Sequence, residues 1–415
     1  MVKNILVLLI WQASQYVIPL VTLPYLSRTL GVQEFGNLAI ATNIVNYFLL
    51  VLDSGFCLIA TQQIAQNATR LSDLRNIFWH AFFAKLLLSA ICFVILLLGI
   101  GLLPFLAKMQ WIIFYCSLQL LAAAFTVNWF LQGMERMVAL TVSAMVGKLL
   151  TIPATFWLVN GPADGWIAAG IQSAAATTTA ILSLFFALKA APLRPFIFQW
   201  KGIIWQATEG WHVLLSQATV SIYSQSNVVI LGLIAGPVEA GLFNGADRIR
   251  KAVQSLIAPV SSAMYPRINN LMSHNQDAAI KTMTLSFFLQ AMLTSILSLI
   301  MFLSAKTGTL LVLGPQFVDS VPIVQILAIL PLLVGVSNAL GVQIMLPFGM
   351  KRQYSSALVV GGVFNIALLI PLSILLGAVG AAIAVVITEL ILILLMSLFL
   401  LNRRRHAHLS PNDIS

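Results

Sequence analysis

The sequence predicts an all-α polytopic membrane protein, with about twelve transmembrane helices in two six-helix halves around a central cavity. The first observation is composition: of 415 residues, 60% are hydrophobic and only 8% are charged, whereas a soluble domain has about 25% charged residues. The second is that apolar runs of about 20 residues, the length of one span, recur along the whole chain. The third is an internal repeat of turn motifs. These observations exclude a soluble enzyme, a disordered chain and a disulfide-stapled secreted module.

Hydropathy and polar breaks place each expected span in order along the chain. The approximate limits are 5–27, 36–58, 80–104, 111–132, 141–159, 166–190, 211–234, 241–265, 282–304, 321–342, 355–376 and 380–401. The first run is longer than a signal-peptide core of about 7–15 residues and no A-x-A site follows it, so we expect an uncleaved span. Cys57, Cys92 and Cys116 all lie in apolar runs, which predicts neither a disulfide nor a metal site.

The distribution of lysine and arginine predicts that both termini are cytoplasmic. With this orientation, 14 of the 22 basic residues fall on the inside and at most Arg28, Lys108 and Lys306 fall outside. The inner ones are Lys3, Arg70, Arg75, Arg136, Lys189, Arg194, Lys201, Arg267, Lys281, Lys351, Arg352, Arg403, Arg404 and Arg405. The formal charge of +10 therefore fits membrane orientation better than a nucleic-acid partner. The longest polar connections, about 191–210 and 266–281, are also expected inside.

Three turn motifs occur twice, in the same order, at similar offsets. The pattern G-x-x-E-x-G spans residues 31–36 and again 236–241; G-M-x-R begins at Gly133 and at Gly349; and the stretch that starts at Gly165 resembles the one that starts at Gly377. We interpret this as two parallel halves, 1–200 and 201–415, the second ending in a short basic cytoplasmic tail. Parallel repeats are typical of transporters that bind substrate at the repeat interface. The alternative is chance similarity among glycine-rich turns.

Several stretches resemble a known family, the O-antigen and polysaccharide-repeat flippases (Wzx-type) of the multidrug/oligosaccharidyl-lipid/polysaccharide exporter superfamily. The stretches are LPYLSRTLG (23–31) followed by Phe35-Gly36, then Asp53-Ser54-Gly55, WFLQG (129–133) and the run from Gly241 to Arg267. The resemblance implies a V-shaped pair of helix bundles in the bacterial cell inner membrane. It also implies export of an undecaprenyl-diphosphate-linked oligosaccharide to the periplasmic leaflet by alternating access. Expected partners are membrane lipids, a polysaccharide polymerase and a chain-length regulator, without a cofactor.

The expected eighth span carries the strongest candidate site. At 100° per residue, Asp247, Arg248, Lys251 and Gln254 fall on one arc with Arg250 at its edge, opposite an apolar arc. Charges inside a membrane are costly and usually face a bundle interior or a water-filled cavity. Arginine suits a diphosphate because its planar fork binds phosphate oxygens in pairs. Two alternatives are that Asp247 and Lys251 merely neutralise each other, or that this helix lies in the membrane interface.

Polar residues in other spans extend the candidate site. Asn43 and Asn46 in the second span, and Tyr223 and Asn227 in the seventh, belong to stripes that suit sugar hydroxyls; helix–helix hydrogen bonding is the alternative for any single residue. The family resemblance implies that Arg28, the arginine of the S-R-x-L-G stretch, lines the cavity, although it could instead extend to the periplasmic interface.

The remaining charges within spans suggest coupling or simple packing. Glu389 and Asp53 are candidates for proton coupling; a protonated, packed glutamate and a helix-end role for Asp53 are the alternatives. Lys85 and Lys148 are expected to extend to the inner interface. The chain has no nucleotide-binding loop, paired metal ligands or nucleophile elbow, so no catalytic residue is predicted. A gradient, or consumption of substrate on the far side, would supply the energy.

Two other function classes remain as alternatives. A cation-coupled multidrug antiporter of the same superfamily would need acidic residues along its lumen, and the membrane acids here are only Asp53, Asp247 and Glu389. A membrane enzyme such as a polysaccharide polymerase would need a sizeable outer loop. The longest one expected, about 305–320, carries only Lys306 and Asp319 as charged residues.

Overall fold

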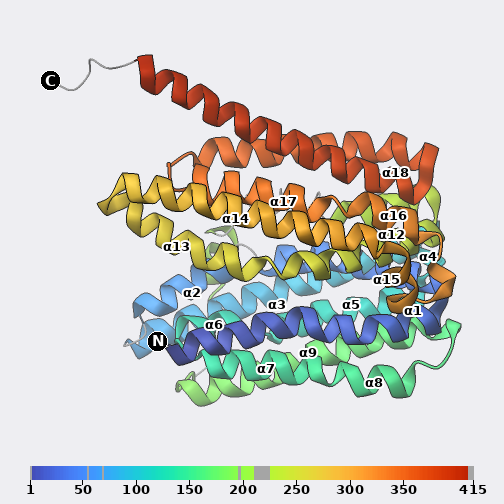
Figure 1. Ribbon diagram of the computed structural model, residues 1–415. Helices are drawn as coiled ribbons and strands as arrows, with labels where there is room; N and C mark the ends of the chain where they lie inside the picture. The colour runs from blue at the N-terminus through green and yellow to red at the C-terminus, as the bar shows by residue number, and fades with distance from the viewer. Residues whose placement is uncertain (1, 54–55, 68–69, 195–197, 210–224, 410–415) are drawn as a thin grey trace. The chain divides into compact units, whose positions relative to one another are not determined.

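The computed structural model describes residues 2–53, 56–67, 70–194, 198–209 and 225–409, and within these ranges it contains helices and no strand (Figure 1). The helices of the first part are α1 (Val2–Asp53), α2 (Phe56–Asn67), α3 (Leu71–Leu102), α4 (Pro104–Ala107), α5 (Gln110–Phe125), α6 (Asn128–Gly133), α7 (Met137–Leu149), α8 (Thr151–Leu158), η1 (Pro162–Asp164), α9 (Gly165–Ala190) and α10 (Trp200–Glu209). A helix from Gln225 to Ala235 follows. The later ones are α12 (Pro237–Ser255), α13 (Ala258–His274), α14 (Gln276–Leu303), α15 (Ala305–Val312), η2 (Pro315–Phe317), α16 (Ser320–Leu327), α17 (Leu330–Asn338), η3 (Ala339–Met345) and α18 (Lys351–Leu409).

The helical membrane architecture predicted from hydropathy is confirmed. Among the described residues, eight stretches are long and apolar enough to cross a membrane. Two of them contain a break where a glycine takes a left-handed conformation, Gly31 in α1 (φ 71°) and Gly377 in α18 (φ 56°). The elements α1 and α18 therefore each consist of two helices joined at the glycine, in agreement with the expected divisions between spans 5–27 and 36–58 and between spans 355–376 and 380–401. The exact number of twelve spans stays a prediction.

Both long polar connections contain helix. The connection expected at 191–210 contains the helix α10, and the one expected at 266–281 is mostly the second half of α13, followed at once by α14. Asn275 separates these two helices and caps α14, since its Oδ1 accepts a hydrogen bond of 3.0 Å from the Ala278 N–H. The expected eighth span, 241–265, is also divided. α12 ends at Ser255 and α13 begins at Ala258 with a proline in its first turn, a position that proline favours.

The chain divides into two compact units, Met1–Val229 and Ile230–Ser415. This boundary lies later than residue 200, where the sequence analysis places it. In the first unit α3 packs along α5, and α5 and α7 pack along α9 (Figure 1). Aromatic rings fill one end of this unit: the ring centroid of Phe78 lies 5.7 Å from that of Trp129 and 5.1 Å from that of Phe130. These rings hold α3 against α6.

The second unit has a buried polar chain between α14, α17 and η3. Ser286 Oγ donates to Gln343 Oε1 at 2.8 Å, Gln343 Nε2 to Gln290 Oε1 at 2.6 Å, and Gln290 Nε2 to the Gly335 carbonyl at 3.0 Å. Gln343 lies in η3, a π-helical turn. Each glutamine amide is hydrogen-bonded to the next group in this series, and these hydrogen bonds offset the cost of burying polar groups inside an apolar bundle.

The internal repeat recurs as a three-dimensional contact. In the first unit a Cβ at Gly165 would lie 2.7 Å from Oε2 of Glu34, and in the second unit a Cβ at Gly377 would lie 2.5 Å from Oε2 of Glu239. Glu239 Oε2 also accepts a hydrogen bond of 2.6 Å from the Ala378 N–H. In both units the glutamate of G-x-x-E-x-G therefore meets the glycine of the third repeated motif. This shared contact supports two copies of one design.

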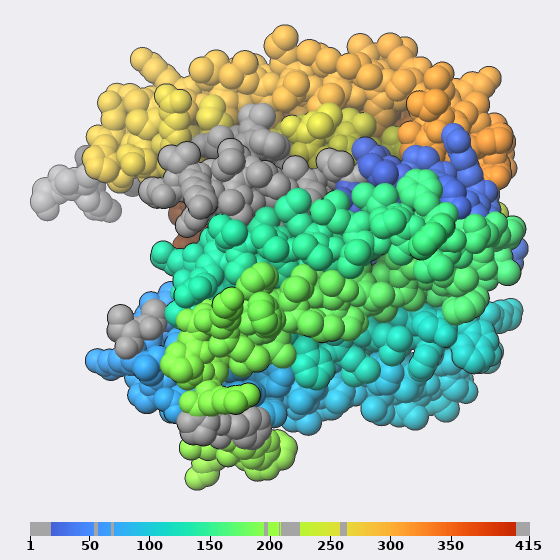
Figure 2. All heavy atoms as spheres, turned by 90° about the horizontal axis from the view of Figure 1, so that it is seen from below, coloured from blue at the N-terminus to red at the C-terminus, as the bar shows by residue number. Residues whose placement is uncertain are grey.

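The surface of the first unit is apolar where it would face lipid. Figure 2 shows segments from α3 (light blue) to α9 (green) as one continuous surface. Leu98 on α3, Val142 on α7 and Phe185 on α9 are all exposed. Exposed apolar side chains in such number are stable in hydrocarbon and would promote association in water.

Candidate substrate-binding sites

The cationic face of α12 is built around one carboxylate. Asp247 Oδ1 lies 2.7 Å from Arg250 Nε, and Asp247 Oδ2 lies 2.8 Å from Lys251 Nζ. Gln254 Oε1 accepts a further hydrogen bond from Arg250 Nη1. These spacings of three and four residues place the groups on one side of the helix. Arg250 is nearly buried, with 11% of its side chain exposed, whereas 56% of the Lys251 side chain is exposed.

This face keeps a net positive charge although its carboxylate is paired. Asp247 neutralises one of the three cations Arg248, Arg250 and Lys251, which leaves a formal charge of +2. The pairing of Asp247 with Lys251 that was expected as an alternative is present, and Arg250 shares the same carboxylate. The opposite arc of α12, with Ile249, is apolar and lines a pocket of about 200 Å³ with residues of α14 and α15. The amphipathic arrangement predicted for this segment is present in the structure.

Glu389 lies on α18, which packs against α12. Its carboxylate is buried and accepts a hydrogen bond of 3.2 Å from Ser337 Oγ on α17.

The candidates of the first unit are less gathered. Arg28 is exposed one turn before the break at Gly31. Asn43 is half-buried and donates from Nδ2 to its own helix at the Ala39 carbonyl, 2.8 Å away; Asn46 is half-buried on the same helix. Asn227 is buried. Tyr223, with the rest of the stripe at 216–224, lies outside the described residues.

Lys85 and Asp53 form an ion pair that the sequence analysis missed. Lys85 Nζ lies 2.8 Å from Asp53 Oδ1 and 3.3 Å from the Thr126 carbonyl oxygen. Only 2% of the Lys85 side chain is exposed, against 61% for Asp53. The expectation that Lys85 extends to the membrane interface is therefore wrong, because a carboxylate 32 residues away in sequence is available to it inside the bundle.

A polar pocket of about 360 Å³ opens beside this pair. It is lined by residues from the end of α1, from α2, α3 and α6, and from the segment before α6: Asp53, Cys57, Leu58, Thr61, Lys85, Thr126, Asn128, Trp129 and Gln132. Two of the stretches that carry the family resemblance, the one that starts at Asp53 and the one that starts at Trp129, meet here. In the sequence these two stretches are separate motifs, and their spacing does not indicate that they line one pocket.

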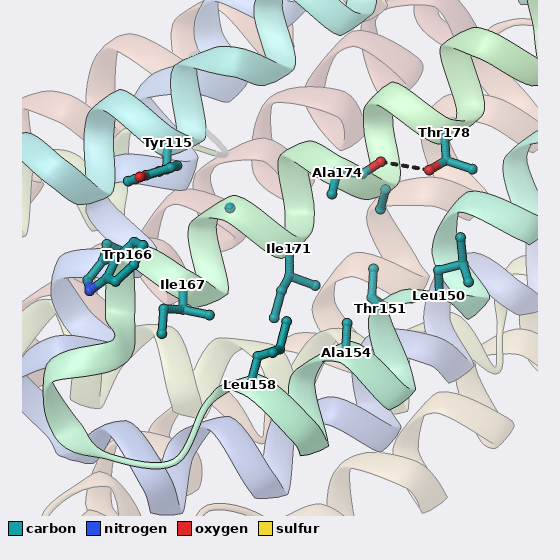
Figure 3. A pocket seen from close by; sticks show the side chains of 12 residues that line it. Tyr115, Leu150, Thr151, Ala154, Leu158, Trp166, Ile167, Ile171, Ala174 and Thr178 are labelled. Carbon is teal, nitrogen blue, oxygen red and sulfur yellow. Dashed lines mark hydrogen bonds between the residues drawn. The ribbon is translucent and has the colours of Figure 1, made fainter.

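A second pocket of the first unit is different in kind. Figure 3 shows Ala154 and Leu158 of α8 facing Ile171 of α9, with Tyr115 and Trp166 at one end. The volume is about 290 Å³ and the lining has no charged side chain. Thr178 directs its hydroxyl to its own helix, at the Ala174 carbonyl 2.9 Å away. This groove suits a lipid chain better than a polar substrate.

Similarity to known proteins identifies the family of this chain. The family model described as "Polysaccharide biosynthesis protein" matches residues 1–272. The chain belongs to this polysaccharide biosynthesis family. It is 33% identical over 402 residues to a protein of Escherichia coli (strain K12) named "Putative O-antigen transporter", with 97% of each chain covered. A Shigella dysenteriae protein of the same name is 28% identical over 400 residues, covering 95% of this chain and 99% of its own. The family resemblance inferred from the motifs is confirmed.

Solved structures of other proteins share the fold of this chain. A multidrug resistance MATE family transporter of the MOP superfamily, inward-facing, superposes with a TM-score of 0.77 over 96% of both chains at 16% identity. The lipid II flippase MurJ superposes with a TM-score of 0.75 over 96% of this chain and 87% of its own, at 11% identity. At these identities the likeness establishes a shared transporter fold.

Proposed function

We propose that this protein is a flippase that moves an undecaprenyl-diphosphate-linked polysaccharide repeat unit, such as an O-antigen unit, from the cytoplasmic to the periplasmic leaflet of the bacterial inner membrane by alternating access. The observation that carries the proposal is the cationic face of α12. It is positive by two charges inside an apolar helical unit, and the related proteins named for O-antigen transport extend over nearly the whole chain. The mechanism involves transport without formation of a glycosidic bond.

The proposed contact is between the diphosphate and the three cations of α12. In the structure Asp247 occupies Nε of Arg250 and the ammonium of Lys251. A diphosphate carries more negative charge than one carboxylate and accepts paired hydrogen bonds from a guanidinium. It would compete with Asp247 for these donors, so the carboxylate holds Arg250 and Lys251 in position until the substrate arrives. Arg28, Asn43, Asn46, Tyr223 and Asn227 remain candidates for contacts along the path.

We propose Glu389 as the proton-coupling group. Its carboxyl is buried, has a hydroxyl donor in Ser337 and lies on a helix that packs against α12, so its protonation would change the charge beside the cationic face. Asp53, the other candidate for proton coupling, is paired with Lys85. Both termini are proposed to be cytoplasmic, and the proposed protein partners are a polysaccharide polymerase and a chain-length regulator.

The second candidate function is cation-coupled multidrug antiport. The buried Glu389 favours it, because a protonatable carboxyl in a membrane interior is the group that such an exchange needs. It predicts that loss of the gene raises drug sensitivity and leaves surface polysaccharide unchanged, which is the reverse of the flippase prediction.

A cellular experiment tests the role of the cationic face. Arg248→Ala with Arg250→Ala should abolish surface polysaccharide while the protein remains in the membrane. Lys281→Ala with Lys351→Ala is the matched control, since it removes two exposed positive charges from the same unit and should leave polysaccharide unchanged. Normal polysaccharide in the arginine double variant would contradict the proposed role of α12.

A further inference from the structure

The pocket beside Asp53 and Lys85 is a polar site within an apolar unit. Lys85 is almost fully buried, and its ammonium uses two of its three N–H groups on Asp53 and on the Thr126 carbonyl. Burying an ammonium is costly unless it is paired and hydrogen-bonded. A bundle that needs only stability would place an apolar side chain here, so this arrangement points to a use for the polar groups.

Two polar atoms of the pocket lining have no partner in the described part of the chain. They are Nε1 of Trp129 and Oδ1 of Asn128. Trp129 is 5% exposed, and a buried indole N–H usually finds an acceptor. One of these atoms is a donor and the other an acceptor, so this part of the lining holds unused hydrogen-bonding groups of both kinds.

The charge of the pocket selects among ligand classes. The only charged side chains in the lining are Asp53 and Lys85, which compensate each other. The pocket therefore does not favour an anion such as a phosphate, in contrast to the cationic face of α12. Its polar groups are a mixture of donors and acceptors, completed by the hydroxyl of Thr61 and the amide of Gln132. A sugar hydroxyl both donates and accepts, so a neutral polyol matches this set.

The size and position of the pocket agree with a sugar. Its volume of about 360 Å³ lies within the range of roughly 300–1,000 Å³ typical of small-molecule sites. Leu58 and Trp129 supply an apolar wall beside the polar groups, as a sugar ring requires. Asp53 and Gln132 are exposed, so the pocket is open at that side. In the predicted orientation this opening lies toward the cytoplasm, where the repeat unit is assembled.

We propose that this pocket binds a sugar residue of the lipid-linked substrate, and that Asp53, Lys85, Asn128, Trp129 and Gln132 recognise its hydroxyls. The inference rests on the proposed flippase function and deepens it. The diphosphate is common to every carrier, whereas the sugar distinguishes one carrier from another.

The test compares carriers with and without a sugar. The purified full-length protein in lipid nanodiscs is titrated with bare undecaprenyl diphosphate and with undecaprenyl diphosphate carrying one glucose, galactose or N-acetylglucosamine. The wild-type protein should bind at least one glycosylated carrier more tightly than the bare one. Gln132→Ala and Trp129→Phe should each reduce that preference by about two- to tenfold, the value of one neutral hydrogen bond. Affinity for the bare carrier should not change.

Other outcomes overturn the inference in distinguishable ways. If the wild-type protein binds all carriers equally, the pocket does not recognise sugar, although the flippase proposal stands. If the variants weaken bare and glycosylated carriers alike, the pocket acts on the carrier or the fold. If no carrier binds, the flippase proposal fails and this inference fails with it. Gln132→Ala keeps the test valid even if Trp129→Phe does not fold, since Gln132 is exposed.

Discussion

Removing one charge of the Asp53–Lys85 pair should destabilise the protein, whereas removing both charges should restore stability. Asp53→Asn leaves the ammonium of Lys85 buried at 2% exposure, with the Thr126 carbonyl as its remaining hydrogen-bond partner. Removing one partner of a fully buried pair costs about 3–5 kcal/mol. Asp53 is 61% exposed, so water screens part of the interaction and we expect a loss of about 1–3 kcal/mol. Adding Lys85→Met to Asp53→Asn should then restore stability, because it removes the unpaired buried charge.

Thermal unfolding of the detergent-purified protein, followed by tryptophan fluorescence at one scan rate, measures this. For a unit of this size about 1 kcal/mol corresponds to ~2–4 °C, so Asp53→Asn should lower the unfolding temperature by roughly 2–12 °C. The double variant should unfold at a higher temperature than Asp53→Asn alone. Lys108→Met, at an exposed lysine, is the control and should have little effect. The reasoning is refuted if Asp53→Asn is neutral or if the double variant is less stable than the single one.

Two further substitutions test the turns and caps that define the helices. Gly377→Ala should destabilise the protein by about 1–2 kcal/mol because of the left-handed backbone alone. The loss should be larger because the added Cβ would meet the Glu239 carboxylate. Gly101→Ala is the control: it adds a Cβ where the space within a helix is open, and it should be neutral or stabilising in the same unfolding assay. Asn275→Ala should cost about 1 kcal/mol by removing the cap of α14, whereas Asn275→Asp should retain it; equal stability of these two variants would argue against the cap.

Hydropathy predicted most helices because a membrane requires every spanning backbone to satisfy its own hydrogen bonds. Hydropathy did not predict the helices that lie within the polar connections. α13 continues to His274 through polar residues, and α10 forms with Trp200 and Ile204 exposed and Ile203 buried. These segments are helices with a polar or interfacial side, a pattern that average hydropathy does not distinguish from a connection.

Of the candidate site residues, too, one group could be predicted from the sequence and another could not. The face of α12 could be predicted, since Asp247, Arg250 and Lys251 are close in sequence and one helical period brings them together. The partnership of Lys85 with Asp53 could not, because it depends on how α3 packs beside the end of α1. The pocket that joins them to Trp129 depends on the same packing. Local periodicity therefore predicted the cationic face of α12, and only the tertiary structure shows the pocket beside Asp53 and Lys85.

The most direct test of the proposed function is translocation itself. The purified protein is reconstituted into liposomes that contain a fluorescent undecaprenyl-diphosphate-linked oligosaccharide, and the fraction that becomes accessible to a membrane-impermeant quencher is followed with time. The proposal predicts that the wild-type protein and Lys281→Ala/Lys351→Ala raise this fraction, and that Arg248→Ala/Arg250→Ala does not rise above protein-free liposomes. No translocation by the wild-type protein, or full translocation by the arginine double variant, would contradict it.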